Sequence, residues 1–181
     1  MASMRSPDPI TEATAYQQHL LALVGDDDPA LAQESTIAQM RRLLTIPNPR
    51  LRTRPAQGEW SAIEVAGHIL DAEIVYSARY RWILAHDEPE LIGYDQDRWV
   101  ERLGYQDAEP NDMAELFEPL RRANVALWRK TPSGDRARVG MHRERGPESF
   151  ELSFRLVCGH DRLHLRQAWQ TLEATGAADA A

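Results

Sequence analysis

The sequence predicts an all-α fold, a four-helix bundle with a small β-hairpin or loop before the last helix. Long stretches carry apolar residues at helical spacing, no set of alternating strands accompanies them, and short segments rich in proline and glycine separate them. The chain has 181 residues, 43% of them hydrophobic, which fits one domain. We expect a flexible N-terminus over 1–9, the bundle domain over 10–173 and a flexible tail over 174–181.

The first third of the chain contains two helical patterns. One covers about 10–24 and ends at a Gly-Asp-Asp-Asp-Pro turn. The next covers about 30–46, with Pro29 in its first turn after an aspartate that suits an N-cap. A Pro-Asn-Pro segment ends this helix, and we expect residues 47–58 to form a loop.

The best-defined helix start is at Ser61. Glu64, three residues later, completes a capping box, and the helix is expected to reach about residue 85. Residues 86–111 predict turns with a short helix near 94–103. A further helix is expected over about 112–130, kinked at Pro119. Residues 137–149 suit a small hairpin that turns near Arg145-Gly-Pro147, and the last helix is expected over 149–173.

Charge and composition exclude some classes of function. The formal net charge is −7, whereas a nucleic-acid-binding protein usually presents a basic face. Cys158 is the single cysteine, so no intrachain disulfide is expected, which fits a reducing compartment. The sequence shows no secretory signal pattern and no apolar run of membrane-spanning length. We therefore expect a cytoplasmic protein with neither nucleic-acid nor membrane partners.

Two of the six histidines, His160 and His164, are four residues apart and so share one helix face. On a helical wheel both lie in the apolar stripe of the last helix, opposite three arginines. Two buried imidazoles carry four ring nitrogens that need partners. A bound metal would satisfy two of these nitrogens. Core histidines that bond backbone or water are the alternative, and the pattern leaves both readings open.

His68, about two turns into the helix that starts at Ser61, is the best third ligand. Its neighbours Glu64 and Asp71 could orient an imidazole, although the capping box already occupies Glu64 and Asp71 more simply reads as a surface carboxylate. His19, His86 and His142 are expected at the surface or in loops. Three histidine ligands would leave a coordination position open, as catalytic metals require.

Other polar residues have weaker claims. Tyr94, Asp95 and Asp97 could line a pocket mouth, but turn and capping chemistry is the simpler interpretation. Arg79 could hold a substrate carboxylate, although an exposed or ion-paired arginine is the more common case. Cys158 points away from His160 on the wheel and is excluded as a ligand.

Several segments resemble the DinB-like (YfiT-like) superfamily in the order that family shows. They are Gly58-Glu-Trp-Ser61 followed by Ala66-Gly-His68-Ile-Leu-Asp71-Ala-Glu73, Gly159-His160-Asp-Arg-Leu-His164-Leu-Arg-Gln167, Leu-Val-Gly25-Asp-Asp-Asp-Pro29, Gly93-Tyr-Asp-Gln-Asp97-Arg-Trp99, and Gly140-Met-His142 through to Gly146. The resemblance covers most of residues 20–173. It implies a four-helix bundle and a divalent metal held by His68, His160 and His164.

The resemblance also implies what the metal does. Zinc or nickel is expected first, with iron or manganese as the alternatives. Members of the family include thiol-dependent transferases, so we expect a metal-dependent transferase that uses a low-molecular-weight thiol on a small-molecule substrate. The alternatives are a metal-dependent hydrolase and a non-catalytic metal-binding or stress-response protein, so whether the chain is an enzyme stays open. Family members are often homodimers, and a homodimer is expected here. No residue is assigned as catalytic beyond the ligands.

Overall fold

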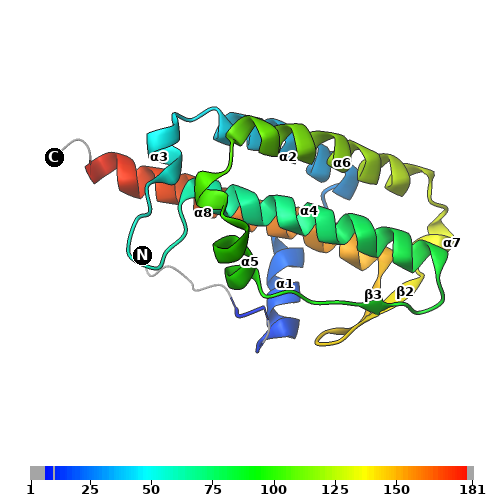
Figure 1. Ribbon diagram of the computed structural model, residues 1–181. Helices are drawn as coiled ribbons and strands as arrows, with labels where there is room; N and C mark the ends of the chain where they lie inside the picture. Colours follow the sequence, from blue (N-terminus) through cyan, green and yellow to red (C-terminus); the bar gives the residue numbers. More distant parts are fainter. Residues whose placement is uncertain (1–6, 10, 179–181) are drawn as a thin grey trace.

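Four long helices form the bundle that the apolar periodicity predicts (Figure 1). The computed structural model describes residues 7–9 and 11–178. Residues 1–6 and 179–181, which belong to the expected flexible termini, and residue 10 lie outside the described residues. The helices that build the bundle are α2 (Pro29–Leu44), α4 (Ala62–Ala85), α6 (Pro110–Lys130) and α8 (Phe150–Ala178). Pro119 lies inside α6 without ending it, and α8 extends five residues beyond its expected end.

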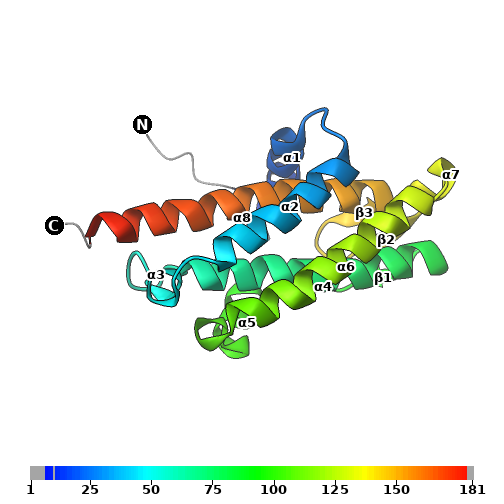
Figure 2. The same cartoon turned by 90° about the horizontal axis from the view of Figure 1, so that it is seen from above.

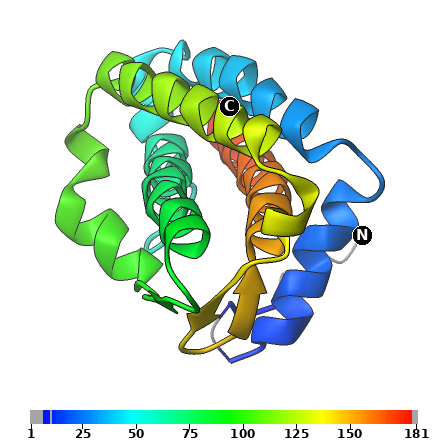
Figure 3. The same ribbon diagram turned by 90° about the vertical axis from the view of Figure 1, so that its right-hand side faces the viewer.

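An additional helix, α1 (Ala13–Val24), packs on the outer side of α8 (Figure 3). It ends at Gly25, whose φ of 57° is a conformation that L side chains rarely adopt. The Asp28 side chain then accepts hydrogen bonds from the backbone nitrogens of Ala30 and Leu31 and caps α2. The predicted cap and turn between the first two helices are therefore confirmed.

The connections contain more regular structure than the sequence pattern predicts. Residues 47–58 were expected to form a loop throughout, but α3 (Asn48–Arg52) lies within them. The short helix expected near 94–103 is confirmed as α5 (Gln96–Leu103), whereas the 3-10 helix η1 (Tyr105–Asp107) and α7 (Ser133–Arg136) were not expected. A helix of five residues is too short to repeat an apolar position, so periodicity does not reveal it.

The small hairpin before the last helix is confirmed as β2 (Val139–His142) paired with β3 (Gly146–Ser149). A third strand, β1 (Glu90–Leu91), pairs with β2 in parallel and was not expected. It packs closely, because a Cβ at Gly140 would lie 2.8 Å from the Leu91 side chain. The sheet lies beside α4 and α8, on the side away from α2 and α6 (Figure 3).

The core has two main clusters along the bundle. One joins residues 62–70 of α4 to residues 165–172 of α8, and the other joins residues 76–83 of α4 to residues 150–157 of α8. The two helices therefore run antiparallel, side by side (Figure 2). Residues near position 68 of α4 consequently face residues 160–164 of α8, at the junction of the two clusters. Among the described helices, none is both long and apolar enough to span a membrane.

Candidate metal centre

The start of α4 is fixed by a network around Glu64. Its carboxylate accepts hydrogen bonds from the backbone nitrogen of Ser61 at 2.8 Å and from the Ser61 hydroxyl at 2.9 Å. Arg54 also donates two hydrogen bonds to this carboxylate. The predicted capping box is thus confirmed. Its hydrogen bonds occupy the Glu64 carboxylate, which lies one helical turn before His68. This anchoring holds the first turns of α4, and with them His68, in place.

A glycine directly precedes His68 in α4 and His160 in α8. A Cβ at Gly67 would overlap the ring of Tyr105, and a Cβ at Gly159 would overlap the carbonyl group of Leu20 in α1. These glycines let η1 and α1 approach the helix backbones beside His68 and His160. Close cover on both outer sides keeps the two histidines facing the space between α4 and α8.

His68, His160 and His164, here called the histidine triad, lie together and are buried. One ring nitrogen from each lies within 4.8 Å of the others. Nε2 of His68 is 2.9 Å from Nε2 of His160, and the ring centroids of His68 and His164 are 4.5 Å apart. The structure therefore brings together the three histidines that the sequence analysis singled out.

Burial favours the neutral form of all three imidazoles. Burial lowers the pKa of His68 and of His160 well below the ordinary value, and the neighbouring His164 lowers both further. Burial also lowers the pKa of His164, although its hydrogen bond to Gln167 opposes this. Neutral imidazoles keep a lone pair, which is the state that a metal ion binds.

The triad leaves ring nitrogens without partners. Nδ1 of His68, Nδ1 of His160 and Nε2 of His164 are buried and form no hydrogen bond within the described structure. Nδ1–H of His164 donates to Oε1 of Gln167 at 2.8 Å, which leaves the lone pair of Nε2 directed elsewhere. Unsatisfied buried nitrogens are costly in an apolar core. A set of three neutral nitrogen donors fits a divalent transition metal.

The comparisons with known proteins agree with this fold. Residues 32–168 match the model of the DinB superfamily. The chain belongs to the DinB superfamily. It is 24% identical over 124 residues, 68% of this chain and 71% of the relative, to a protein of Oceanobacillus iheyensis whose name marks it as a candidate metal-dependent hydrolase.

A solved DinB-like structure gives the same architecture. YfiT of Bacillus subtilis, described as a probable metal-dependent hydrolase with an unusual four-helix bundle topology, superposes with a TM-score of 0.73. The match covers 97% of this chain and 95% of YfiT at 17% sequence identity. At that identity the likeness shows the fold, which confirms the predicted four-helix bundle.

Aromatic and acidic side chains surround the triad of this DinB protein. The rings of Trp60 and Tyr94 lie 5.2 Å and 6.5 Å from that of His68. Asp71, one turn after His68, is buried, although a surface position was expected. Oδ1 of Asp71 accepts a hydrogen bond from the Tyr105 hydroxyl, whereas Oδ2 has no partner. Burial raises the pKa of Asp71 to about 6, against the opposing effect of the Tyr105 hydrogen bond.

A buried ionic network supports α8 beside the triad, and the sequence analysis did not find it. Arg121 of α6 donates to Asp161 at 2.6 Å and to Glu73 at 2.8 Å. Asn124 donates to the second oxygen of Glu73 at 2.7 Å. The three charged side chains are almost completely buried. Asp161 follows His160 directly, so this network ties the part of α8 that carries His160 to α4 and α6.

The remaining candidates lie away from the triad. His86 is exposed and His19 is half-buried, as expected for surface positions, but His142 is buried in β2 and its predicted surface position is wrong. Asp95 caps α5 by accepting from the backbone nitrogen of Arg98, so the capping interpretation holds there. The sequence pattern does not reveal that His142, unlike His19 and His86, becomes buried.

Cys158 and Arg79 are both buried outside the triad. Cys158 is buried, and its thiol contacts the carbonyl oxygens of Pro29 and Phe154 at 3.3 Å. Its predicted exclusion from the triad agrees with this placement, and burial raises its pKa to about 12. Arg79 is only 2% exposed and forms no ion pair with any described residue, contrary to the expected exposed or paired arginine.

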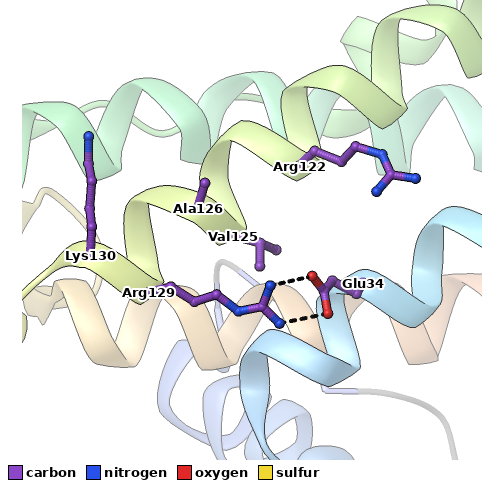
Figure 4. A pocket seen from close by; sticks show the side chains of 6 residues that line it. All are labelled: Glu34, Arg122, Val125, Ala126, Arg129 and Lys130. Atoms are coloured by element: carbon purple, nitrogen blue, oxygen red, sulfur yellow. Dashed lines mark hydrogen bonds and ion pairs between the residues drawn. The ribbon is translucent and has the colours of Figure 1, made fainter.

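A surface pocket of about 550 Å³ lies between α2 and α6 (Figure 4). Arg129 pairs there with Glu34 through two contacts of 2.7 Å and 2.8 Å. Its lining consists of Glu34, Arg122, Val125, Ala126, Arg129 and Lys130. None of the triad histidines lines this pocket, so it is separate from the candidate metal centre.

Proposed function

We propose that this DinB protein depends on a divalent metal ion and that His68, His160 and His164 bind it. The observation that carries the proposal is the triad itself, three buried imidazoles with one ring nitrogen each within 4.8 Å of the others. The names of relatives from two bacteria, each referring to a metal-dependent hydrolase, support the same function. Imidazole ligands favour zinc or nickel, with iron or manganese as alternatives.

We further propose that the nucleophile is a low-molecular-weight thiol. Cys158 is the single cysteine of the chain, lies outside the triad and has a raised pKa, so it does not supply a reactive thiolate. A thiol nucleophile must then come from a small molecule. Three protein ligands would leave one coordination position of a divalent metal open for the thiol. The metal would lower the pKa of a thiol bound in this position, so that it is a thiolate at neutral pH.

The side chains around the triad have definite tasks in this proposal. Gln167 accepts a hydrogen bond from Nδ1 of His164, so the lone pair that could bind the metal is on Nε2. Trp60 and Tyr94 cover the His68 ring and exclude water from that side. Asp71, held by Tyr105 through Oδ1, has no task in the transfer reaction, because a thiol bound to the metal would lose its proton to solvent. Because the proposed nucleophile is a thiolate, the substrate in this proposal is a small electrophile to which the thiol is transferred.

Hydrolysis is the second candidate, favoured by the names of the two relatives. It needs a general base for water, and the unpartnered oxygen of Asp71 is available for that task. Glu64 is excluded from it, because Ser61 and Arg54 occupy its carboxylate. The two reactions therefore differ in how strongly they depend on Asp71.

One pair of assays separates the two reactions. Metal-loaded protein is incubated with cysteine or glutathione and a fluorogenic electrophile, and separately with a p-nitrophenyl ester without thiol. A transferase consumes thiol and loses little activity in Asp71→Asn, since the thiolate needs no protein base. A hydrolase cleaves the ester without thiol and loses about 10²-fold or more in the same variant.

The exposed Asp112 provides the matched control, and Asp112→Asn should leave either activity unchanged. Activity that persists after chelation, or in His160→Ala at the wild-type rate, would contradict the proposal for both reactions. Ester cleavage without any thiol consumption would reject the transferase and retain the hydrolase.

A further inference from the structure

A second buried polar cluster lies beside the small sheet, further along α4 from His68. It consists of Arg79 of α4, His142 of β2, Arg145 of the hairpin turn and Glu148 of β3, here called the Arg79 cluster. Arg79, His142 and Glu148 are at most 3% exposed. Charged groups at such burial are normally paired, because removing them from water is costly.

The charges of the cluster do not balance. Glu148 accepts from Arg145 at 2.9 Å and from the Ser153 hydroxyl at 2.8 Å, so its carboxylate is occupied. Arg79 has no carboxylate partner among the described residues; it donates to the carbonyl oxygen of Ile92 at 2.6 Å and lies over the Tyr76 ring. Its Nε is buried without a partner. One buried positive charge is therefore left without a counter-ion.

His142 shows the same lack of an acceptor. Nε2 of His142 is 3.3 Å from the Arg79 guanidinium, and Nδ1 is 3.3 Å from the backbone nitrogen of Glu144. Both neighbours are donors, whereas a neutral imidazole has one donor and one acceptor nitrogen. Whichever tautomer is present, one N–H of His142 faces another donor. An acceptor placed between these groups would relieve the conflict.

The surroundings of the ring are strongly positive. Burial lowers the pKa of His142 to about 4, and the charges of Arg145 and Arg79 contribute to the shift. Glu144, the nearest additional carboxylate on the hairpin turn, is exposed and lies over Gly93, without an ion pair to Arg79. The cluster therefore gathers donors and positive charge without a matching internal acceptor.

We propose that Arg79 and His142 form a binding site for the carboxylate group of a small-molecule ligand. The planar guanidinium fork matches a carboxylate, and a single negative charge balances the single unpaired positive charge. The ligand reaches the site beside Ile92, which is 66% exposed and whose carbonyl group already contacts Arg79. None of the residues of the site is a proposed metal ligand.

The test uses the full-length wild-type protein with acetate as the probe. Histidine side chains labelled with ¹⁵N are followed by NMR at neutral pH while acetate replaces chloride at constant ionic strength. The His142 signal, identified by its loss in His142→Gln, is expected to shift saturably. The shift should persist after chelation, which separates this site from the metal proposal. Absence of a saturable shift in the wild-type protein overturns the proposal.

Two variants and a second anion sharpen the result. Arg79→Lys keeps the positive charge without the fork and is expected to weaken acetate binding at least about tenfold. Arg138→Lys is the matched control, because Arg138 also donates to a backbone carbonyl nearby but has Asp87 as its counter-ion. Unchanged binding in Arg79→Lys, loss of binding after chelation, or tighter binding of inorganic phosphate than of acetate would each contradict the carboxylate site.

Discussion

Nδ1 of His164 lies 2.8 Å from Oε1 of Gln167, one helical turn further along α8. An amide oxygen can only accept a hydrogen bond, so it selects the tautomer in which Nδ1 carries the proton. The lone pair of His164 is then on Nε2. A side chain outside the triad thereby leaves on Nε2 the lone pair that the proposed metal would need.

Replacing Gln167 should weaken metal binding without removing a ligand. In Gln167→Leu the ring of His164 loses its orienting acceptor, and the affinity for zinc is expected to fall about 10- to 100-fold. The measurement is a competition titration with a chromophoric chelator. The exposed Gln170 lies on the same helix, and Gln170→Leu should retain wild-type affinity. Equal affinities in the two variants would show that Gln167 does not orient His164.

Loss of Arg121 should destabilise the whole bundle. Arg121→Met leaves Glu73 and Asp161 buried without their common partner, which is expected to lower the free energy of unfolding by about 3–5 kcal/mol. Urea denaturation measures the change. The neighbouring Arg122 is exposed and pairs with Glu118, so Arg122→Met should cost at most about 1 kcal/mol. Similar losses in both variants would refute the special role of the buried network.

Gly159 should not tolerate a methyl group. In Gly159→Ala the new Cβ meets backbone atoms of Leu20, so α1 must move away from α8. We expect a loss of about 1–3 kcal/mol in the free energy of unfolding, despite the better helix propensity of alanine. Gly134→Ala, where a Cβ meets no atom within 4 Å, is the control. A stabilised Gly159→Ala protein would mean that α1 does not approach α8 so closely.

The burial of His142 should make stability depend on pH. Its pKa falls from the ordinary 6.5 to about 4 in the folded chain, so between these values only the unfolded chain binds the proton. The free energy of unfolding should therefore be retained above about pH 6.5 and fall as the pH is lowered towards 4. The other buried histidines add to the same trend, so the informative quantity is a difference between proteins.

That difference is measured by urea denaturation of the wild-type protein and His142→Gln in chloride buffers over this pH range. Between pH 4 and 6.5 the free energy of unfolding of the variant should depend less steeply on pH than that of the wild type. The difference in slope is at most about 1.4 kcal/mol per pH unit, which corresponds to one proton. Parallel curves for the two proteins would show that His142 titrates alike in the folded and unfolded chains.

The sequence contained enough information for the bundle and the triad. Apolar spacing predicts the long helices, because each buries one continuous stripe against its neighbours. His160 and His164 share a face through their spacing alone, whereas His68 came from its place on a helix face and from the family resemblance. The antiparallel packing of α4 and α8 then brings His68 to the other two.

The polar groups buried around the triad could not be predicted in the same way. Asp71 reads as a surface residue because its partner, Tyr105, is 34 positions away with no spacing that links them. His142 is buried by the pairing of β2 with β1, a two-residue strand too short to leave a pattern. Arg79 is polar in sequence but buried by the same sheet. Tertiary contacts, rather than local periodicity, decide these positions.

Elemental analysis of the purified protein tests the metal proposal most directly. We predict about one equivalent of a divalent transition metal per chain, lost in His160→Ala and retained in the control His86→Ala, since His86 is exposed and outside the triad. Circular dichroism confirms that both variants are folded. A wild-type protein that neither contains metal nor takes up zinc or nickel, or a folded His160→Ala protein with the wild-type metal content, would contradict the assignment of the triad.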